Sequence, residues 1–239
     1  HIWTLHCIFQ APSSEGTHFL EDPDYMFNRK GAALAFVVAG VVSGAHAFAP
    51  LAPGGAVLVP DLSLPGDAVL IDLRSDAFVG MNALSEVLYT GTVESYVFRQ
   101  AAGNLIFGYI VYNDATSIDE ISAVSMTDFA GWVTEVGQDP AAAGSASMSP
   151  ATSASRSTGG GTVTFNFTRD PLGRGALEQG TASYGMMIRT NATDYTRGTV
   201  NVLNGAIATV ESFAPVPEPA SIAALGVGAA ALLRRRKKA

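Results

Sequence analysis

Residues 91–114 read GTVESYVFRQAAGNLIFGYIVYND, and this stretch decides the fold class. Val93 to Arg99 and Leu105 to Tyr112 are rich in Tyr, Phe, Val and Ile, which are residue types enriched in strands. Gly103 and Asn104 lie in the short connection between them. The pattern therefore predicts a β-hairpin whose loop is longer than two residues.

Stretches further along the chain have the same character. Thr162 to Phe167 alternates polar and apolar residues after three glycines at 159–161, which predicts a strand with one apolar face behind a flexible connection. Val200 to Leu203 and Ala206 to Val210 flank Asn204-Gly205. This predicts a second hairpin, with a two-residue turn that has φ > 0 at both residues. The other predicted strands are Ile118 to Phe129, Trp132 to Val136 and Tyr184 to Thr190.

Many short strands with turn signals, and no convincing helical stretch, predict an all-β domain. We expect a β-sandwich-like domain of the Greek-key or Ig-like type over residues 67–213. Residues 48–66 are rich in Pro and Gly and are predicted to be a loose lead-in. Residues 140–157 are rich in Ala, Ser and Pro and are predicted to be a long surface loop.

The composition of residues 48–213 limits the chemistry of this domain. It contains seven Arg and sixteen Asp plus Glu, hence a net charge of −9, and no Lys, His or Cys. This removes the commonest general base and metal ligand, and all thiol chemistry. An acidic, Lys-free domain is also a poor partner for nucleic acid. We expect a protein that is not an enzyme, with no catalytic residues, no metal site and no cofactor.

Three alternative sites remain open on the sequence. Asp114, Asp119 and Glu120 follow a predicted strand end and are candidates for calcium ligands. A platform of aromatic residues on strands can stack against sugar rings. Its candidates are Phe107, Tyr109 and Trp132. The plentiful carboxylates also leave open an exported hydrolase that uses two of them.

The N-terminal part has the order of a secretory signal peptide. Met26 opens the stretch, Arg29 and Lys30 give it a positive start, and Gly31 to Val42 form an apolar segment. Ala45-His46-Ala47 is a cleavage site of the A-x-A type, with Ala45 and Ala47 as the small residues that signal peptidase needs. We therefore interpret 26–47 as a signal helix for the secretion machinery, and 1–25 as an upstream extension outside the exported protein.

The C-terminal part, residues 214–239, has three pieces in fixed order. Three prolines at 215, 217 and 219 surround Glu218 and cannot continue a helix or a sheet ladder, so the backbone there is predicted to be extended and accessible. An uncharged run from Ala220 to Leu233 follows. The basic cluster comes last, and consists of Arg234, Arg235, Arg236, Lys237 and Lys238. An apolar run followed by positive charges predicts a membrane anchor with its basic end in the cytoplasm. A helix of about 14 residues spans only about 21 Å of the roughly 30 Å hydrocarbon core, which suits a transient anchor.

These three pieces together resemble the PEP-CTERM sorting signal of bacterial exported proteins. Pro217, Glu218 and Pro219 match the recognition triplet, Ser221 to Leu233 the membrane segment, and Arg234 to Arg236 the stop. The resemblance implies that the chain is held in the membrane by its tail and processed near the triplet by an exosortase, an integral-membrane protease or transpeptidase. It implies delivery to the cell surface or to an extracellular polysaccharide matrix.

The sequence therefore predicts an exported surface or matrix-associated protein that is the substrate of an exosortase. One alternative is an anchored carbohydrate- or calcium-binding adhesion module. Another is an ordinary tail-anchored surface protein with a Pro-rich stalk in front of its membrane helix.

Overall fold

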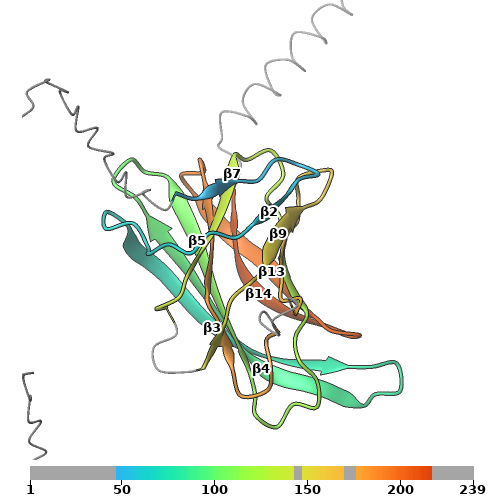
Figure 1. Ribbon diagram of the computed structural model, residues 1–239. Helices are drawn as coiled ribbons and strands as arrows, with labels where there is room; N and C mark the ends of the chain where they lie inside the picture. Colours follow the sequence, from blue (N-terminus) through green and yellow to red (C-terminus); the bar gives the residue numbers. More distant parts are fainter. Residues whose placement is uncertain (1–46, 143–146, 170–175, 217–239) are drawn as a thin grey trace, which may run out of the picture. The chain divides into compact units, whose positions relative to one another are not determined.

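The computed structural model describes residues 47–142, 147–169 and 176–216. These ranges contain fourteen strands in two sheets and no helix, so the prediction of an all-β, sandwich-like domain is confirmed (Figure 1). The signal helix and the membrane helix fall outside the described residues. Within the described residues, no helix is long and apolar enough to cross a membrane.

The first sheet, here called sheet A, has eight strands. Its central path runs β1-β7-β12-β5, with β4 on the other side of β5, β3 on the far side of β4, and β11 and β8 continuing beside the end of β5. The strands are β1 (Ala49–Pro50), β3 (Val69–Met81), β4 (Val87–Arg99), β5 (Leu105–Asn113), β7 (Thr134–Asp139), β8 (Met148–Ser149), β11 (Ala182–Ser183) and β12 (Gly185–Thr190).

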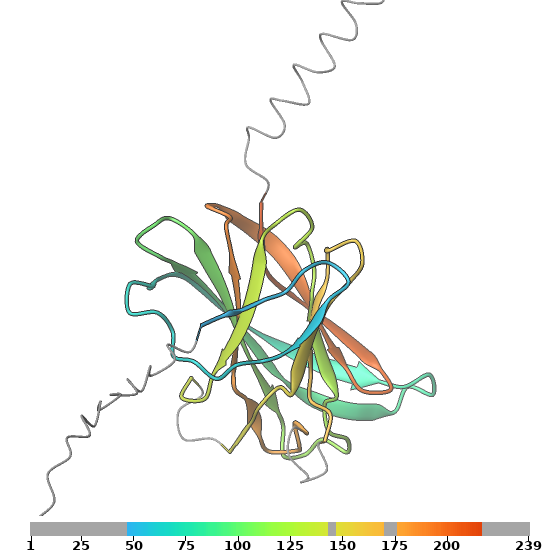
Figure 2. The same cartoon turned by 45° about the horizontal axis from the view of Figure 1, so that its top comes forward.

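The second sheet, sheet B, has six strands in the order β14-β13-β6-β10-β9-β2. They are β2 (Ala56–Leu58), β6 (Ala123–Met126), β9 (Ser153–Arg156), β10 (Val163–Asn166), β13 (Tyr195–Leu203) and β14 (Ile207–Pro215). The strands of both sheets can be followed in Figures 1 and 2.

The core lies between the inner faces of the two sheets. On β4, alternate residues point inward, as the period of two requires, and Tyr89, Val93 and Val97 are buried. Val163 and Phe165 on β10 are also fully buried and belong to the same apolar cluster. Two tyrosines place their hydroxyls against backbone carbonyls inside this cluster: Tyr89 donates to Val202 and Ala206, and Tyr109 donates to Phe213.

The predicted hairpin around residue 103 is confirmed as β4 and β5, joined by residues 100–104. Gly103 has φ +91°, which suits a glycine at this turn. The prediction for the second hairpin is right in its strands but wrong in its turn. The register pairs Leu203 with Ile207, so the loop has three residues, 204–206, and only Gly205 has positive φ. Such a loop joins strands through one left-handed residue.

Two segments predicted to be irregular contribute strands. The predicted lead-in 48–66 supplies β1, which pairs with β7 in sheet A, and β2, which pairs with β9 in sheet B. Figure 2 shows this segment in blue as it crosses the domain. The predicted loop 140–157 supplies β8 and β9, and β9 lies inside sheet B between β10 and β2. The predicted strand over 118–129 is shorter than expected: β6 covers only Ala123–Met126, and Ile121 forms an isolated bridge with Leu177.

Candidate functional site

The C-terminal end of the domain is where the predicted sorting signal starts. The last strand, β14, pairs with β13 as far as Pro215 opposite Tyr195. Val216 is partly exposed and donates its N–H to the carbonyl of Asp194 at 3.1 Å. The predicted triplet Pro217, Glu218 and Pro219, and the predicted basic stop Arg234 to Lys238, lie outside the described residues.

Proline is tolerated at position 215 because the strand pairing needs no backbone N–H there. Val216 and Asp194 form a hydrogen-bonded pair, and such pairs alternate with pairs that exchange no backbone bonds. Pro215 and Tyr195 are the next pair along, so the N–H that proline lacks is not needed there. The sequence alone predicted an accessible Pro-rich segment here. The structure instead has Pro215 buried in the last strand.

The predicted signal-peptide cleavage site lies at the other end of the described domain. Ala45 is outside the described residues, and Ala47 is exposed. The next residue, Phe48, is buried, and the guanidinium of Arg189 lies over its ring at 4.6 Å. Cleavage after Ala47 would therefore leave the new N-terminus next to a packed side chain.

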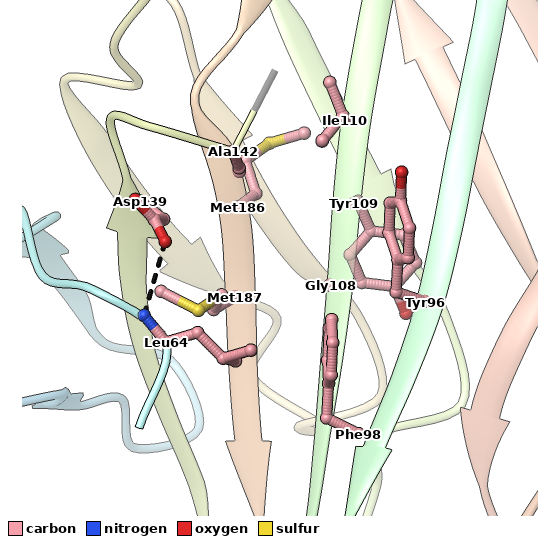
Figure 3. Close-up of a pocket in the computed structure, with 11 residues that line it drawn as sticks. Leu64, Tyr96, Phe98, Gly108, Tyr109, Ile110, Asp139, Ala142, Met186 and Met187 are labelled. Carbon is pink, nitrogen blue, oxygen red and sulfur yellow. Dashed lines mark hydrogen bonds between the residues drawn. The ribbon is translucent and has the colours of Figure 1, made fainter. Parts of the chain in front are cut away.

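The outer face of sheet A carries a groove that sequence reasoning missed. Its lining is mostly apolar, and its free space is about 230 Å³. Figure 3 shows Tyr96 and Phe98 of β4 on one side, and Leu64 and Met187 on the other. The rings of Tyr96 and Phe98 are nearly parallel, with centroids 6.0 Å apart. Gly108 lies beneath Phe98, since a Cβ atom there would come within 3.1 Å of the ring.

Asp139 is a polar group in the lining of this groove, and Glu94 lies next to the lining residue Tyr96. Glu94 accepts hydrogen bonds from the Tyr96 hydroxyl at 2.6 Å and from the Tyr112 hydroxyl at 3.2 Å. Burial, together with the neighbouring Glu94 carboxylate, raises the pKa of both tyrosines, so their hydroxyls stay protonated at neutral pH. Asp139 lies beside Leu64, and its carboxylate accepts hydrogen bonds from the backbone N–H groups of Leu64 and Ala141.

The aromatic platform that the sequence left open as an alternative is not formed by Phe107, Tyr109 and Trp132. Phe107 and Tyr109 are fully buried, and Phe107 makes an edge-to-face contact with Phe129 inside the core. Trp132 is partly buried, in the turn before β7. The alternation of β4 and β5 explains the difference, because Phe107 and Tyr109 point inward, whereas Tyr96 and Phe98 point outward.

Two of the three carboxylates considered for calcium, those of Asp114 and Glu120, have other partners. Asp114 accepts a hydrogen bond from the Thr90 hydroxyl at 2.8 Å, and Glu120 pairs with Arg169 at 3.2 Å. Arg169 also pairs with Glu178. Across residues 47–142, 147–169 and 176–216, no group of three or more His, Cys, Asp and Glu side chains is arranged to hold a metal ion.

Comparison with known proteins places a single motif on this chain. Residues 215–237 match the family model described as the PEP-CTERM protein-sorting motif. No curated protein and no solved structure matches the chain. The match starts at the last residue of β14, and it includes Pro217 to Pro219 and the first four residues of the basic cluster, Arg234 to Lys237.

Proposed function

We propose that this PEP-CTERM protein is an exported, non-catalytic surface protein whose tail is processed by an exosortase and whose β domain is the part delivered. The match to the sorting motif over residues 215–237 carries the proposal. That motif implies exosortase-dependent sorting to the cell surface. The finer steps proposed here are a transient membrane anchor, cutting near Pro217 to Pro219, and a final place on the surface or in the extracellular matrix.

The composition of the domain supports a role as cargo. Residues 48–213 contain no Lys, His or Cys, so this region has neither the commonest general base nor a thiol or amine nucleophile. The net charge of −9 favours solubility outside the cell and disfavours binding to nucleic acid. The proposed partners are the secretion machinery, signal peptidase, the exosortase and the membrane.

The test is expression of a tagged protein in two hosts that differ only in an exosortase gene. We expect a shortened, surface-located or released product only where the enzyme is present. Glu218→Ala should leave the apolar run intact but leave the precursor uncut. Deletion of Arg234 to Lys238 should weaken retention, so that uncut precursor leaves the cell. An identical shortened product from both hosts would refute sorting by an exosortase.

The groove on sheet A favours carbohydrate binding as a second candidate function. Aromatic faces stack against the apolar face of a sugar ring, and carboxylates accept bonds from its hydroxyls. Tyr96 and Phe98 supply the aromatic faces, and Asp139 supplies a carboxylate in the lining of the groove. A free space of about 230 Å³ is below the roughly 300–1,000 Å³ of pockets for drug-sized ligands, so it suits one ring of a longer polysaccharide.

Titration calorimetry with neutral glucan and xylan oligosaccharides tests this candidate. We expect Phe98→Ala to remove binding, because the ring forms the wall over Gly108. Leu84→Ala is the matched control, since Leu84 is an exposed apolar residue at the tip of the β3–β4 hairpin. Unchanged heats for Phe98→Ala would argue against a sugar in this groove.

A further inference from the structure

The sorting motif and the folded domain share residues. The matched stretch begins at Pro215, which is the last residue of β14. Val216 still makes a backbone hydrogen bond to Asp194, and Pro217 follows it directly in the sequence. Within the described residues, Val216 is the last residue that bonds to the sheet, and the recognition triplet begins at the next position of the sequence.

The final residues of β14 are held in two different ways. Phe213 belongs to the core: its ring packs edge-to-face on Tyr195, and its carbonyl accepts the hydroxyl of Tyr109 at 3.0 Å. Residues 214–216, here called the strand end, lie beyond this anchor. They are held by β13 through the pairs Thr196–Ala214 and Tyr195–Pro215 and by the bond from Val216 to Asp194.

Chain length sets how near the triplet lies to the domain. A residue spans at most about 3.6 Å, so Pro219 lies within about 11 Å of Val216. A domain of this size has a radius of gyration of about 15 Å. An enzyme that surrounds an extended substrate over several residues would therefore collide with the domain while the strand end is paired. Releasing residues 214–216 lengthens the free chain between the domain and the triplet by at most about 11 Å.

We propose that the strand end must leave β13 before an exosortase can take up Pro217 to Pro219. This inference rests on the proposed function, because it assumes that the enzyme acts at this triplet. Release stops at Phe213, which the core holds. Local opening of a terminal strand costs less than global unfolding. When reclosing is faster than cutting, the cutting rate follows the population of the opened form.

A disulfide between Tyr195→Cys and Pro215→Cys would hold the strand end closed. These residues face each other in a pair without backbone hydrogen bonds, where Cα atoms lie about 4.5 Å apart, a separation that a disulfide can bridge. The bond would form after export, in an oxidising compartment. Cys7, the only native cysteine, is changed to Ser in every variant.

Two further variants control the experiment. Asn201→Cys with Thr209→Cys places a disulfide at the same kind of pair on the same two strands, but far from the strand end. The other control inserts six Gly and Ser residues after Val216, followed by a second copy of Ala214 to Val216. This insertion gives the triplet its native preceding residues and separates it from the sheet.

Processing is followed in whole cells that contain an exosortase. We expect the 195–215 disulfide to slow cutting at least about tenfold, and the 201–209 disulfide to leave it unchanged. A reductant, or the insertion combined with the 195–215 disulfide, should restore cutting.

Cutting of the 195–215 variant at the native rate would overturn the proposal. It would also be overturned if the insertion failed to restore cutting to that variant. Absence of enzyme-dependent cutting in every variant, the insertion alone included, would instead refute the proposed function.

Discussion

Arg156 is a buried cation that bonds to backbone carbonyls. Its guanidinium donates to the carbonyls of Leu51, Phe129, Trp132 and Gly160 at 2.7–3.0 Å. Burial lowers the pKa of this side chain, but an arginine stays charged at neutral pH. The four carbonyls come from loops and the lead-in, so one side chain joins segments that are distant in sequence.

Removing this side chain should destabilise the domain strongly. Arg156→Ala leaves buried carbonyls without donors, and we expect a loss of about 3 kcal/mol or more. Arg156→Lys should lose a smaller part of this stability, because an ammonium group lacks the planar fork of five donors. Urea unfolding of the purified protein measures the effect. Arg197→Ala, at an exposed site, is the control, and an equal loss there would contradict the role assigned to Arg156.

Asp76 forms an ion pair with Arg74 on the same strand, β3. Arg74 donates two bonds to this carboxylate, and the attraction lowers the pKa of Asp76 below its ordinary value of 3.8. A carboxyl with a lowered folded-state pKa stabilises the fold above its unfolded pKa, and this contribution is lost as pH falls through the folded pKa. Native protein should therefore exceed Asp76→Asn in stability above about pH 5.

The comparison is made by urea unfolding of both proteins from pH 7 to pH 2. The difference between the two midpoints should shrink as the pH falls below 3.8. The size of the effect is limited, because the pair is partly exposed to solvent. A midpoint difference that stays constant over the whole range would contradict the assignment.

Among the elements, the lead-in 48–66 makes the least expected contribution. Phe48 and Leu62 are buried against Ile106 and Met187, and they form a second small core on the outer face of sheet A. Leu62 lies directly over Gly137, where a Cβ atom would come within 2.2 Å of its side chain. Gly137 therefore has no side chain because Leu62 occupies that space.

A double-mutant cycle tests this contact. Leu62→Ala should cost about 2–4 kcal/mol, and Gly137→Ala about 1–3 kcal/mol by overpacking. The double variant should lose less than the sum of the two, because the shortened side chain at position 62 leaves room for the added methyl. Denaturant unfolding of the four proteins gives the coupling energy. Strict additivity would show that the lead-in does not pack on β7.

Sequence reasoning succeeded for elements with aromatic and β-branched alternation. The strands β4, β5 and β10 have this pattern and were predicted, whereas β13 and β14 were predicted only over the residues next to their turn. It failed for β9, whose residues Ser153 to Arg156 have the composition of a loop although Ala154 and Arg156 are buried. Small residues carry little pattern, and the strand becomes evident only from its pairing with β10 and β2.

The alternation along β4 indicates one wall of the groove. In the stretch from Val93 to Phe98, the residues that alternate with the inward-facing Val93 and Val97 are Glu94, Tyr96 and Phe98. A period of two places these three on the outer face. The opposite wall, from Leu64 and Met187, depends on the path of the lead-in, which no local pattern predicts.

At the scale of the whole molecule, the sequence combines a predicted export signal, an acidic β domain and a sorting motif. The tail was predictable because its three pieces occur in fixed order near the end of the chain, and the match over residues 215–237 agrees with it. The absence of a linker before Pro217 was not predictable, since prolines at 215, 217 and 219 suggested an irregular stalk. Only the pairing of Pro215 with Tyr195 shows where the strand ends.

The central claim is that an exosortase cuts this protein at its tail, and the most direct test is mass spectrometry of the mature C-terminus. The protein is purified from the surface and medium of a host with an exosortase, and from the membrane of the same host without it. We predict a C-terminal peptide that ends near Pro217 to Pro219 in the first case, and a chain that continues to Ala239 in the second. The same C-terminus in both preparations would contradict the account.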